Sequence, residues 1–275
     1  MRIGVVAPST PIKRELADRA VEIAAADFPE AELVFHPQCF LTHRHFAGED
    51  HDRAAAFADF ANDRSLDALW FARGGYGSCR IAEEAIARLE PQARDKLYLG
   101  YSDAGFLLAG LWRAGFKHLA HGAMIGDLRR SGGEAAVRRA LGWCVRRDPD
   151  ALEPGLDGRP SVAFNITVLS QLLGTALQPD LSGHVLLLED VSEYMYSIDR
   201  SMFHITSNPG VRAVAGIRLG RVSDVPVNEP DFVADEEEVV RYWCERAAIA
   251  FLGRADIGHD GANRVVPFGA GPNKG

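Results

Sequence analysis

The 275-residue sequence has no apolar run long enough to span a membrane, and it begins without the charged and apolar regions of a signal peptide. Its four cysteines are widely separated and lack C-x-x-C spacing, a pattern typical of reduced, inert cysteines in a cytoplasmic protein. Dense clusters of Lys and Arg are also missing, and the net charge is −8. We therefore expect a cytoplasmic protein with no membrane and no nucleic-acid partner.

Three common catalytic motifs are absent as well. The phosphate-binding patterns G-x-x-x-x-G-K-[ST] and G-x-G-x-x-G do not occur, and neither does the zinc motif H-E-x-x-H. Four histidines cluster at His36, His43, His45 and His51, beside several acidic residues. A metal site needs three or four ligands in convergent geometry. We interpret this cluster as a surface loop and predict no metal, with metal binding there as the alternative.

Strand and helix patterns alternate through the first half of the chain. Short apolar runs such as 66–72 and 97–100 are followed by stretches with apolar residues at helical spacing. This alternation predicts an α/β fold with a parallel sheet covered by helices on both faces. Residues 148–160 are rich in Asp, Pro and Gly and are interpreted as a linker. The expected domains are therefore 1–147 and a smaller unit over 161–275.

A serine lies at a sharp strand-to-helix turn within the run L-Y-L-G-Y-S-D-A-G, residues 97–105. Such a turn exposes the Ser102 hydroxyl and brings the next backbone N–H beside it. A nucleophilic serine needs both, together with a base within hydrogen-bond reach. The alternative is that Ser102 caps the following helix.

A second glycine-rich turn, A-R-G-G-Y-G-S at residues 72–78, also follows a strand and opens a helix. Its glycines allow the backbone to approach a ligand closely. Consecutive N–H groups at a helix N-terminus could bind a phosphate. They could equally donate to an oxyanion. A tight turn without a ligand is the third interpretation, and the residues alone leave all three open.

Two further candidates lie in the second half of the chain. Glu189 ends the apolar run L-L-L-E-D, where a buried carboxylate needs a partner such as a histidine or a helix N-terminus. His259 lies in a loop flanked by glycines, where it is either a functional residue or an exposed one. The order Ser102, Glu189, His259 matches one known order of a catalytic triad.

Taken in order, these runs resemble the serine LD-carboxypeptidases, a family that includes muropeptide LD-carboxypeptidases and microcin-immunity peptidases. The runs that carry the resemblance are I-G-V-V-A-P-S at 3–9, A-R-G-G-Y-G at 72–77, L-G-Y-S-D at 99–103, H-G-A-M at 121–124, N-I-T-V-L-S-Q-L-L-G-T at 165–175, the E-D-V-x-E and I-D-R within 188–200, and I-G-H at 257–259. Ala123 departs from the proline that the family has in the fourth of these runs.

The resemblance implies a serine peptidase that uses neither metal nor cofactor. Ser102 would be the nucleophile, His259 the general base, and Glu189 the acid that orients the base. The oxyanion would be held by the N–H of Asp103 and one N–H from Gly74 or Gly75.

The resemblance also implies an architecture and a substrate. The first domain would be a flavodoxin-like α/β sandwich and the second smaller and β-rich, with the triad across their interface in a homodimeric protein. The substrate would be a small muropeptide-like peptide, most simply murein tetrapeptide, which loses its terminal D-alanine during cell-wall recycling. A microcin-immunity-like peptidase acting on a peptide–nucleotide conjugate is one alternative. A non-catalytic α/β protein that binds an anion at 74–77 is an alternative from another class.

Overall fold

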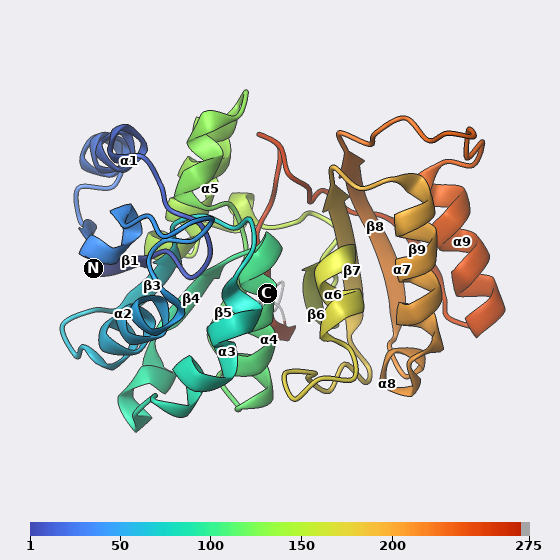
Figure 1. Ribbon diagram of the computed structural model, residues 1–275, viewed down its shortest axis with the longest axis horizontal. Helices are drawn as coiled ribbons and strands as arrows, with labels where there is room; N and C mark the ends of the chain where they lie inside the picture. Colours follow the sequence, from blue (N-terminus) through green and yellow to red (C-terminus); the bar gives the residue numbers. More distant parts are fainter. Residues whose placement is uncertain (271–275) are drawn as a thin grey trace.

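Two β-sheets form the two lobes of the protein in Figure 1. The structure is a computed structural model and describes residues 1–270. The first sheet contains β1 (Arg2–Val6), β2 (Glu32–Phe35), β3 (Ala68–Phe71), β4 (Leu97–Gly100), β5 (Leu119–His121) and β10 (Val266–Pro267). Their order is β10-β5-β4-β3-β1-β2, and only β10 runs antiparallel to its neighbour. The parallel strands thus have the flavodoxin-like order 2-1-3-4-5.

Helices cover both faces of this sheet because its strands bury side chains on both faces. In β3, Ala68 and Trp70 belong to one apolar core, whereas Leu69 and Phe71 belong to the other. Helices α1 (Arg14–Asp27) and α5 (Gly133–Arg146) pack in the first core, and α2 (Asp50–Asn62), α3 (Ser78–Ala87) and α4 (Gly105–Arg113) in the second. The predicted parallel sheet with helices on both faces is confirmed.

The second sheet is smaller and also mostly parallel. Its order is β11-β6-β7-β8-β9, with β11 antiparallel to β6. The strands are β6 (Pro160–Asn165), β7 (Val185–Val191), β8 (Gly216–Ser223), β9 (Phe251–Arg254) and β11 (Gly269–Ala270). The helices are α6 (Ile166–Leu172), α7 (Met195–Ser207), α8 (Pro209–Arg212) and α9 (Glu236–Ala247). Short 3₁₀ turns occur at η1 (Pro37–Phe40), η2 (Pro91–Asp95), η3 (Ser102–Ala104), η4 (Ile125–Arg129) and η5 (Pro149–Ala151).

The end of the described chain connects the two lobes. β10 adds to the first sheet beside β5, and β11 then adds to the second sheet beside β6. Helices α4 and α6 also pack against each other, and their side chains share one apolar core. The loop that carries His259 comes directly before β10. Because β10 and β11 pair with different sheets, this part of the chain holds the loop close to both sheets.

Several elements of the second half differ from the sequence-based expectation. A helical pattern over 235–251 predicts a helix that runs to residue 251, but α9 ends at Ala247 and β9 begins at Phe251. Ala248 ends the helix in the left-handed conformation, with φ +56°. Glycine is the usual residue at such a position, and because alanine occupies it no local signal marks the end of the helix. β6, β9, β10 and β11 were also missed.

The four cysteines are free in the structure, and Cys39, Cys144 and Cys244 are buried. Burial raises the pKa of each of these three thiols to about 12, which keeps them in the unreactive protonated form. Within residues 1–270, no helix combines the length and the hydrophobicity needed to cross a membrane.

Candidate active site

Ser102 lies on a strained turn at the carboxyl end of β4. Its φ is +57°, in the left-handed region that a serine rarely adopts. This strain places the side chain at the sheet edge where ligands bind in such folds. Its hydroxyl makes no capping hydrogen bond within residues 1–270, so the alternative in which Ser102 caps a helix is not supported.

The glycine-rich turn after β3 lies directly against this serine. A Cβ at Gly74 would stand 3.0 Å from Ser102 Oγ, so a larger residue would press on the hydroxyl. The Thr10 hydroxyl donates a hydrogen bond to the Gly74 carbonyl at 2.6 Å. In a trans peptide the next N–H points the opposite way, so the Gly75 N–H points away from Thr10. The turn therefore presents a backbone donor near Ser102.

Asp103 ties the two turns together from beneath. Its carboxylate accepts hydrogen bonds from the Ser9 hydroxyl and, at 2.8 Å, from the Ser78 N–H. The Ser78 hydroxyl donates to the Asp103 carbonyl. Burial raises the pKa of this carboxyl, although the hydrogen bonds from Ser9 and Ser78 oppose the shift. The Asp103 side chain is thus a structural clamp, while its N–H has no acceptor among the described residues.

Glu189 and His259 form a buried pair. His259 Nδ1 lies 2.6 Å from Glu189 Oε2, and both residues are almost fully buried. A carboxylate can only accept hydrogen bonds, so Nδ1 carries the proton and Nε2 is the basic nitrogen of the neutral ring. Burial alone would raise the pKa of Glu189, but the neighbouring imidazoles of His259 and His121 hold it at about 2. Burial alone would lower the pKa of His259, but the charge and hydrogen bond of Glu189 outweigh burial. The pKa of His259 is therefore raised above its ordinary value.

His121 is a second histidine on the same carboxylate, and it was not singled out as a site residue from the sequence. Its Nε2 lies 3.9 Å from Glu189 Oε1, and the ring is 1% exposed. At that separation the contact is electrostatic rather than a hydrogen bond. The feature of the sequence that could have pointed to His121 is its position at the end of β5, within the run H-G-A-M.

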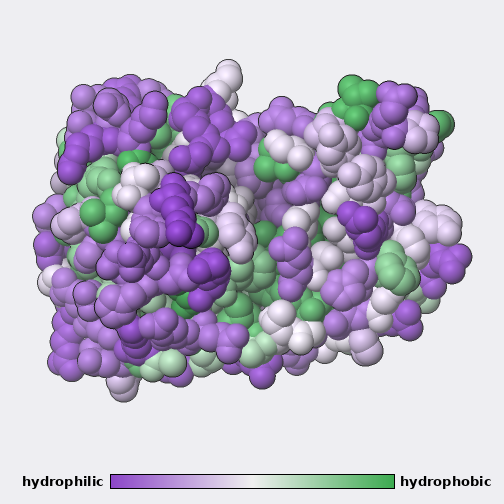
Figure 2. Space-filling model, in the orientation of Figure 1, coloured by the Kyte–Doolittle hydropathy of each residue, from purple (hydrophilic) through white to green (hydrophobic). Residues whose placement is uncertain are grey.

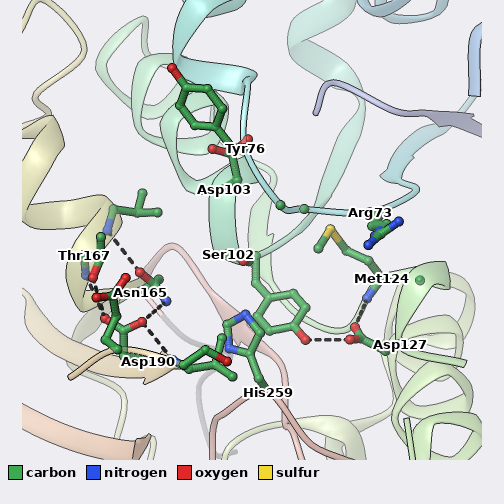
Figure 3. A pocket seen from close by; sticks show the side chains of 18 of the residues that line it. Arg73, Tyr76, Ser102, Asp103, Met124, Asp127, Asn165, Thr167, Asp190 and His259 are labelled. Carbon is green, nitrogen blue, oxygen red and sulfur yellow. Dashed lines mark hydrogen bonds between the residues drawn. The ribbon is translucent and has the colours of Figure 1, made fainter. Parts of the chain in front are cut away.

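Ser102 and His259 line one cavity but share no hydrogen bond. Both line a space of about 410 Å³, and Figure 3 shows the histidine ring beneath the serine. No hydrogen bond joins the two, and His259 Nε2 has no partner within residues 1–270. The ring instead packs on Tyr101, with ring centroids 4.6 Å apart. Catalytic hydrogen bonds of this kind often close only in the complex with substrate.

The cavity lies between the lobes, where the surface in Figure 2 is hollowed. Residues from both sheets line it, including Gly74 and Ser102 from the first domain and Asn165, Thr167 and Asp190 from the second. Four other lining residues were not singled out from the sequence: Arg73, Asp127, Arg129 and Arg130. Arg73 lies in the glycine-rich run 72–77, but nothing in that run marks its side chain as facing a cavity.

The histidine cluster lies apart from this cavity. His43, His45 and His51 are exposed, and the nearest acidic contact is His43 Nδ1 to Glu49 Oε1 at 3.8 Å. Over residues 1–270, no three His, Cys, Asp or Glu side chains converge on a point where a metal ion could bind. The predicted surface loop agrees with this exposure.

Comparison with known proteins gives consistent matches over both domains. Residues 3–122 match the sequence model of an LD-carboxypeptidase N-terminal domain, and residues 160–272 match that of an LD-carboxypeptidase C-terminal domain. A putative carboxypeptidase of Synechocystis is 29% identical over 98% of this chain and 89% of its own length. A murein tetrapeptide carboxypeptidase of Pseudomonas aeruginosa is 25% identical over 98% of this chain and 91% of its own.

Solved structures share the fold. A muramoyltetrapeptide carboxypeptidase from Oxalobacter formigenes superposes with a TM-score of 0.78 at 20% identity, covering 97% of this chain and 93% of that one. A microcin C7 self-immunity protein in complex with aspartyl sulfamoyl adenosine has a TM-score of 0.80 at 17% identity, over 98% and 91% of the two chains. At these identities the likeness concerns the fold alone.

Proposed function

Because the chain belongs to the LD-carboxypeptidase family, we propose that it is a serine carboxypeptidase that releases D-alanine from murein tetrapeptide. The observation that carries the proposal is the buried Glu189–His259 pair, because its histidine lines the same cavity as the strained Ser102. A buried carboxylate on one imidazole nitrogen leaves the other as a base, and a serine on a sharp turn is the matching nucleophile. The related murein tetrapeptide carboxypeptidase of Pseudomonas aeruginosa supports the choice of substrate.

The proposed reaction has two steps. Ser102 Oγ attacks the carbonyl carbon of the amide before the terminal D-alanine, and His259 Nε2 takes the hydroxyl proton. The C–N bond then breaks, and His259 gives that proton to the amine of the departing D-alanine. Water, activated by the same nitrogen, attacks the ester on Ser102 and releases the shortened peptide. Glu189 stabilises the imidazolium that forms in each step.

Backbone donors would hold the negative oxygen of each tetrahedral intermediate. We propose the N–H groups of Asp103 and Gly75 for this role, because neither has an acceptor within residues 1–270. The Thr10 hydrogen bond to the Gly74 carbonyl turns the Gly75 N–H away from Thr10, which favours Gly75 over Gly74. Each such donor contributes about 3 kcal/mol to the transition state in serine peptidases.

Murein tetrapeptide itself tests the proposal. The protein is expected to convert it to tripeptide and free D-alanine, detected by mass spectrometry. The same peptide ending in L-alanine is the matched control and should stay intact. An aminoacyl sulfamoyl adenylate is the third substrate. Cleavage of this compound alone would support the microcin-immunity alternative, and cleavage of none of the three would support a binding protein.

The pH dependence of kcat/KM should reveal the charge of Glu189. His259 must be neutral to accept the serine proton, and its pKa is raised above the ordinary 6.5 by Glu189. Activity should therefore fall as the pH drops through a midpoint above 6.5. In Glu189→Gln the negative charge is gone, so burial of the ring lowers the pKa of His259. The midpoint of the residual activity should therefore move to lower pH. An unchanged midpoint would contradict the proposed pairing.

Three further assignments belong to the same proposal. We propose domain boundaries at 1–147 and 161–275 with the linker 148–160, although the last five residues lie outside the described residues. The protein would act in the cytoplasm on recycled peptides, and as a homodimer. Sedimentation of the purified protein tests the dimer.

A further inference from the structure

Three arginines gather on one side of the cavity. Arg73 follows β3, and Arg129 and Arg130 end the turn η4, so only folding brings them together. Figure 3 shows Arg73 and Asp127 on the opposite side of Ser102 from Asp190 and Thr167. The cavity therefore has one strongly cationic wall next to the proposed nucleophile.

This wall carries more positive charge than its carboxylate neutralises. Asp127 is the acidic residue within it, and Arg130 Nε lies 3.3 Å from Asp127 Oδ1. Asp127 also accepts hydrogen bonds from the Tyr101 hydroxyl and the Met124 N–H. Among the described residues, the Arg73 guanidinium donates only to the Pro11 carbonyl, at 3.2 Å. Neither Arg73 nor its neighbour Arg129 pairs with an acidic side chain of residues 1–270.

Such an arrangement is costly unless an anion binds. Burial, with the charges of Arg129 and Arg130, lowers the pKa of Arg73, as expected where like charges lie near one another. Arg130 Nε is buried, and although it is ion-paired with Asp127 it makes no hydrogen bond among the described residues. Arginine forms planar, charge-assisted hydrogen bonds with carboxylates, and one carboxylate can accept from two such groups.

The position of Arg73 in the chain places the start of its side chain next to the proposed nucleophile. Arg73 directly precedes Gly74, and a Cβ on Gly74 would stand 3.0 Å from Ser102 Oγ. The terminal carboxylate of a carboxypeptidase substrate lies one residue beyond the bond that breaks, a span of about 3.5 Å in an extended chain. A side chain rooted beside the nucleophile is placed to bind a group at that short distance.

We propose that Arg73, Arg129 and Arg130 bind the α-carboxylate of the departing D-residue. This carboxylate clamp, as we call the three side chains, restricts the enzyme to the last peptide bond of its substrate. The inference rests on the proposed function, because it assigns the cationic wall to the leaving side of the same reaction. A peptide that continues past the scissile bond, or whose carboxylate is masked, has no charge to place there.

The test compares murein tetrapeptide with the same peptide ending in D-alaninamide. Wild-type enzyme is expected to prefer the free acid by at least about 10-fold in kcat/KM, because masking removes a charge-assisted contact. Arg73→Ala should lower kcat/KM for the acid by about 10- to 100-fold and leave the amide nearly unchanged. Arg64→Ala removes an exposed arginine outside the cavity and should keep the wild-type preference.

Each other outcome has a defined meaning. Equal cleavage of acid and amide by the wild type overturns the clamp without any variant. An undiminished preference in Arg73→Ala overturns the role of Arg73. If Arg73→Ala does not fold, Arg129→Ala replaces it, since that side chain is exposed, and it should weaken the preference in the same direction. Cleavage of neither peptide by the wild type overturns the proposed function itself, and the clamp with it.

Discussion

Replacing Ser102 by alanine is expected to lower kcat by about 10⁶-fold, as loss of the nucleophile does in other serine peptidases. The substitution removes the only atom proposed to attack the amide, while the turn that holds it stays in place. His259→Ala should cost a similar factor, because without the base the hydroxyl keeps its proton. Single-turnover assays with murein tetrapeptide measure both losses.

The double variant Ser102→Ala, His259→Ala provides the control on this interpretation. Residues that act as one unit give strongly non-additive losses, so the double variant should be little slower than either single one. Independent losses that multiply would mean that the two residues do not share a proton transfer. Activity of Ser102→Ala within about 10-fold of the wild type, far from the loss of a nucleophile, would rule out a serine peptidase.

Replacing Glu189 by glutamine should lower kcat by about 10⁴-fold, less than removal of the nucleophile or base. The glutamine fills the same buried space beside His259, but it carries no charge to stabilise the imidazolium. Its amide can also present an N–H to Nδ1, which favours the wrong ring tautomer. Comparison of kcat at saturating peptide, with thermal unfolding measured in parallel, separates this effect from a loss of folding.

Glu193→Gln is the matched control for the carboxylate. Glu193 lies at the same cavity and accepts a hydrogen bond from the Ser197 hydroxyl at 3.0 Å, without touching His259. Its substitution should leave kcat close to the wild type. Asp190 is a poorer control, because it is buried and accepts hydrogen bonds from Asn165 and Thr167. A crippling effect of Glu193→Gln would show that the acid of the triad has been assigned to the wrong carboxylate.

The first domain could be predicted closely because local signals there agree with the tertiary structure. The apolar run over 97–100 coincides with β4. Helical spacing of apolar residues over 133–146 predicts a helix there, and it coincides with α5. Their apolar spacing reports burial directly, since each strand is covered on both faces. β10 and β11 were missed because two-residue strands carry no periodicity, and their pairing depends on partners far away in the chain.

The candidate site divides in a similar way. Ser102 was found because a strand, a turn and a helix meet there within a few residues, which is a local pattern. His121 approaches Glu189 only because the two sheets meet, so neither segment alone could show that these two residues are close together. The cationic wall depends equally on folding, since Arg73 follows β3 and Arg129 ends the turn η4. Scattered arginines in an acidic chain gave no reason to expect it.

The lack of a hydrogen bond between Ser102 and His259 has a different origin. The sequence predicts their meeting across the domain interface, and the structure brings both to one cavity without a hydrogen bond between them. The ring position is set by Glu189 on one side and Tyr101 on the other, and neither contact involves the serine. A small rotation of the ring, or an approach of the two lobes when substrate binds, would complete the hydrogen bond between Ser102 and His259. The spacing of motifs in the sequence cannot report such a movement.

Covalent capture of the acyl group tests the central claim most directly. A murein tetrapeptide analogue with D-lactate in place of the terminal D-alanine has a better leaving group, so acylation outruns hydrolysis and the ester accumulates. After an acid quench and trypsin digestion, mass spectrometry should find the tripeptide acyl group on the fragment 97–113, which contains Ser102 as its single serine. The acylated fragment should be absent from Ser102→Ala. An adduct on another residue would contradict the account. Turnover of the analogue by Ser102→Ala at the wild-type rate would contradict it as well.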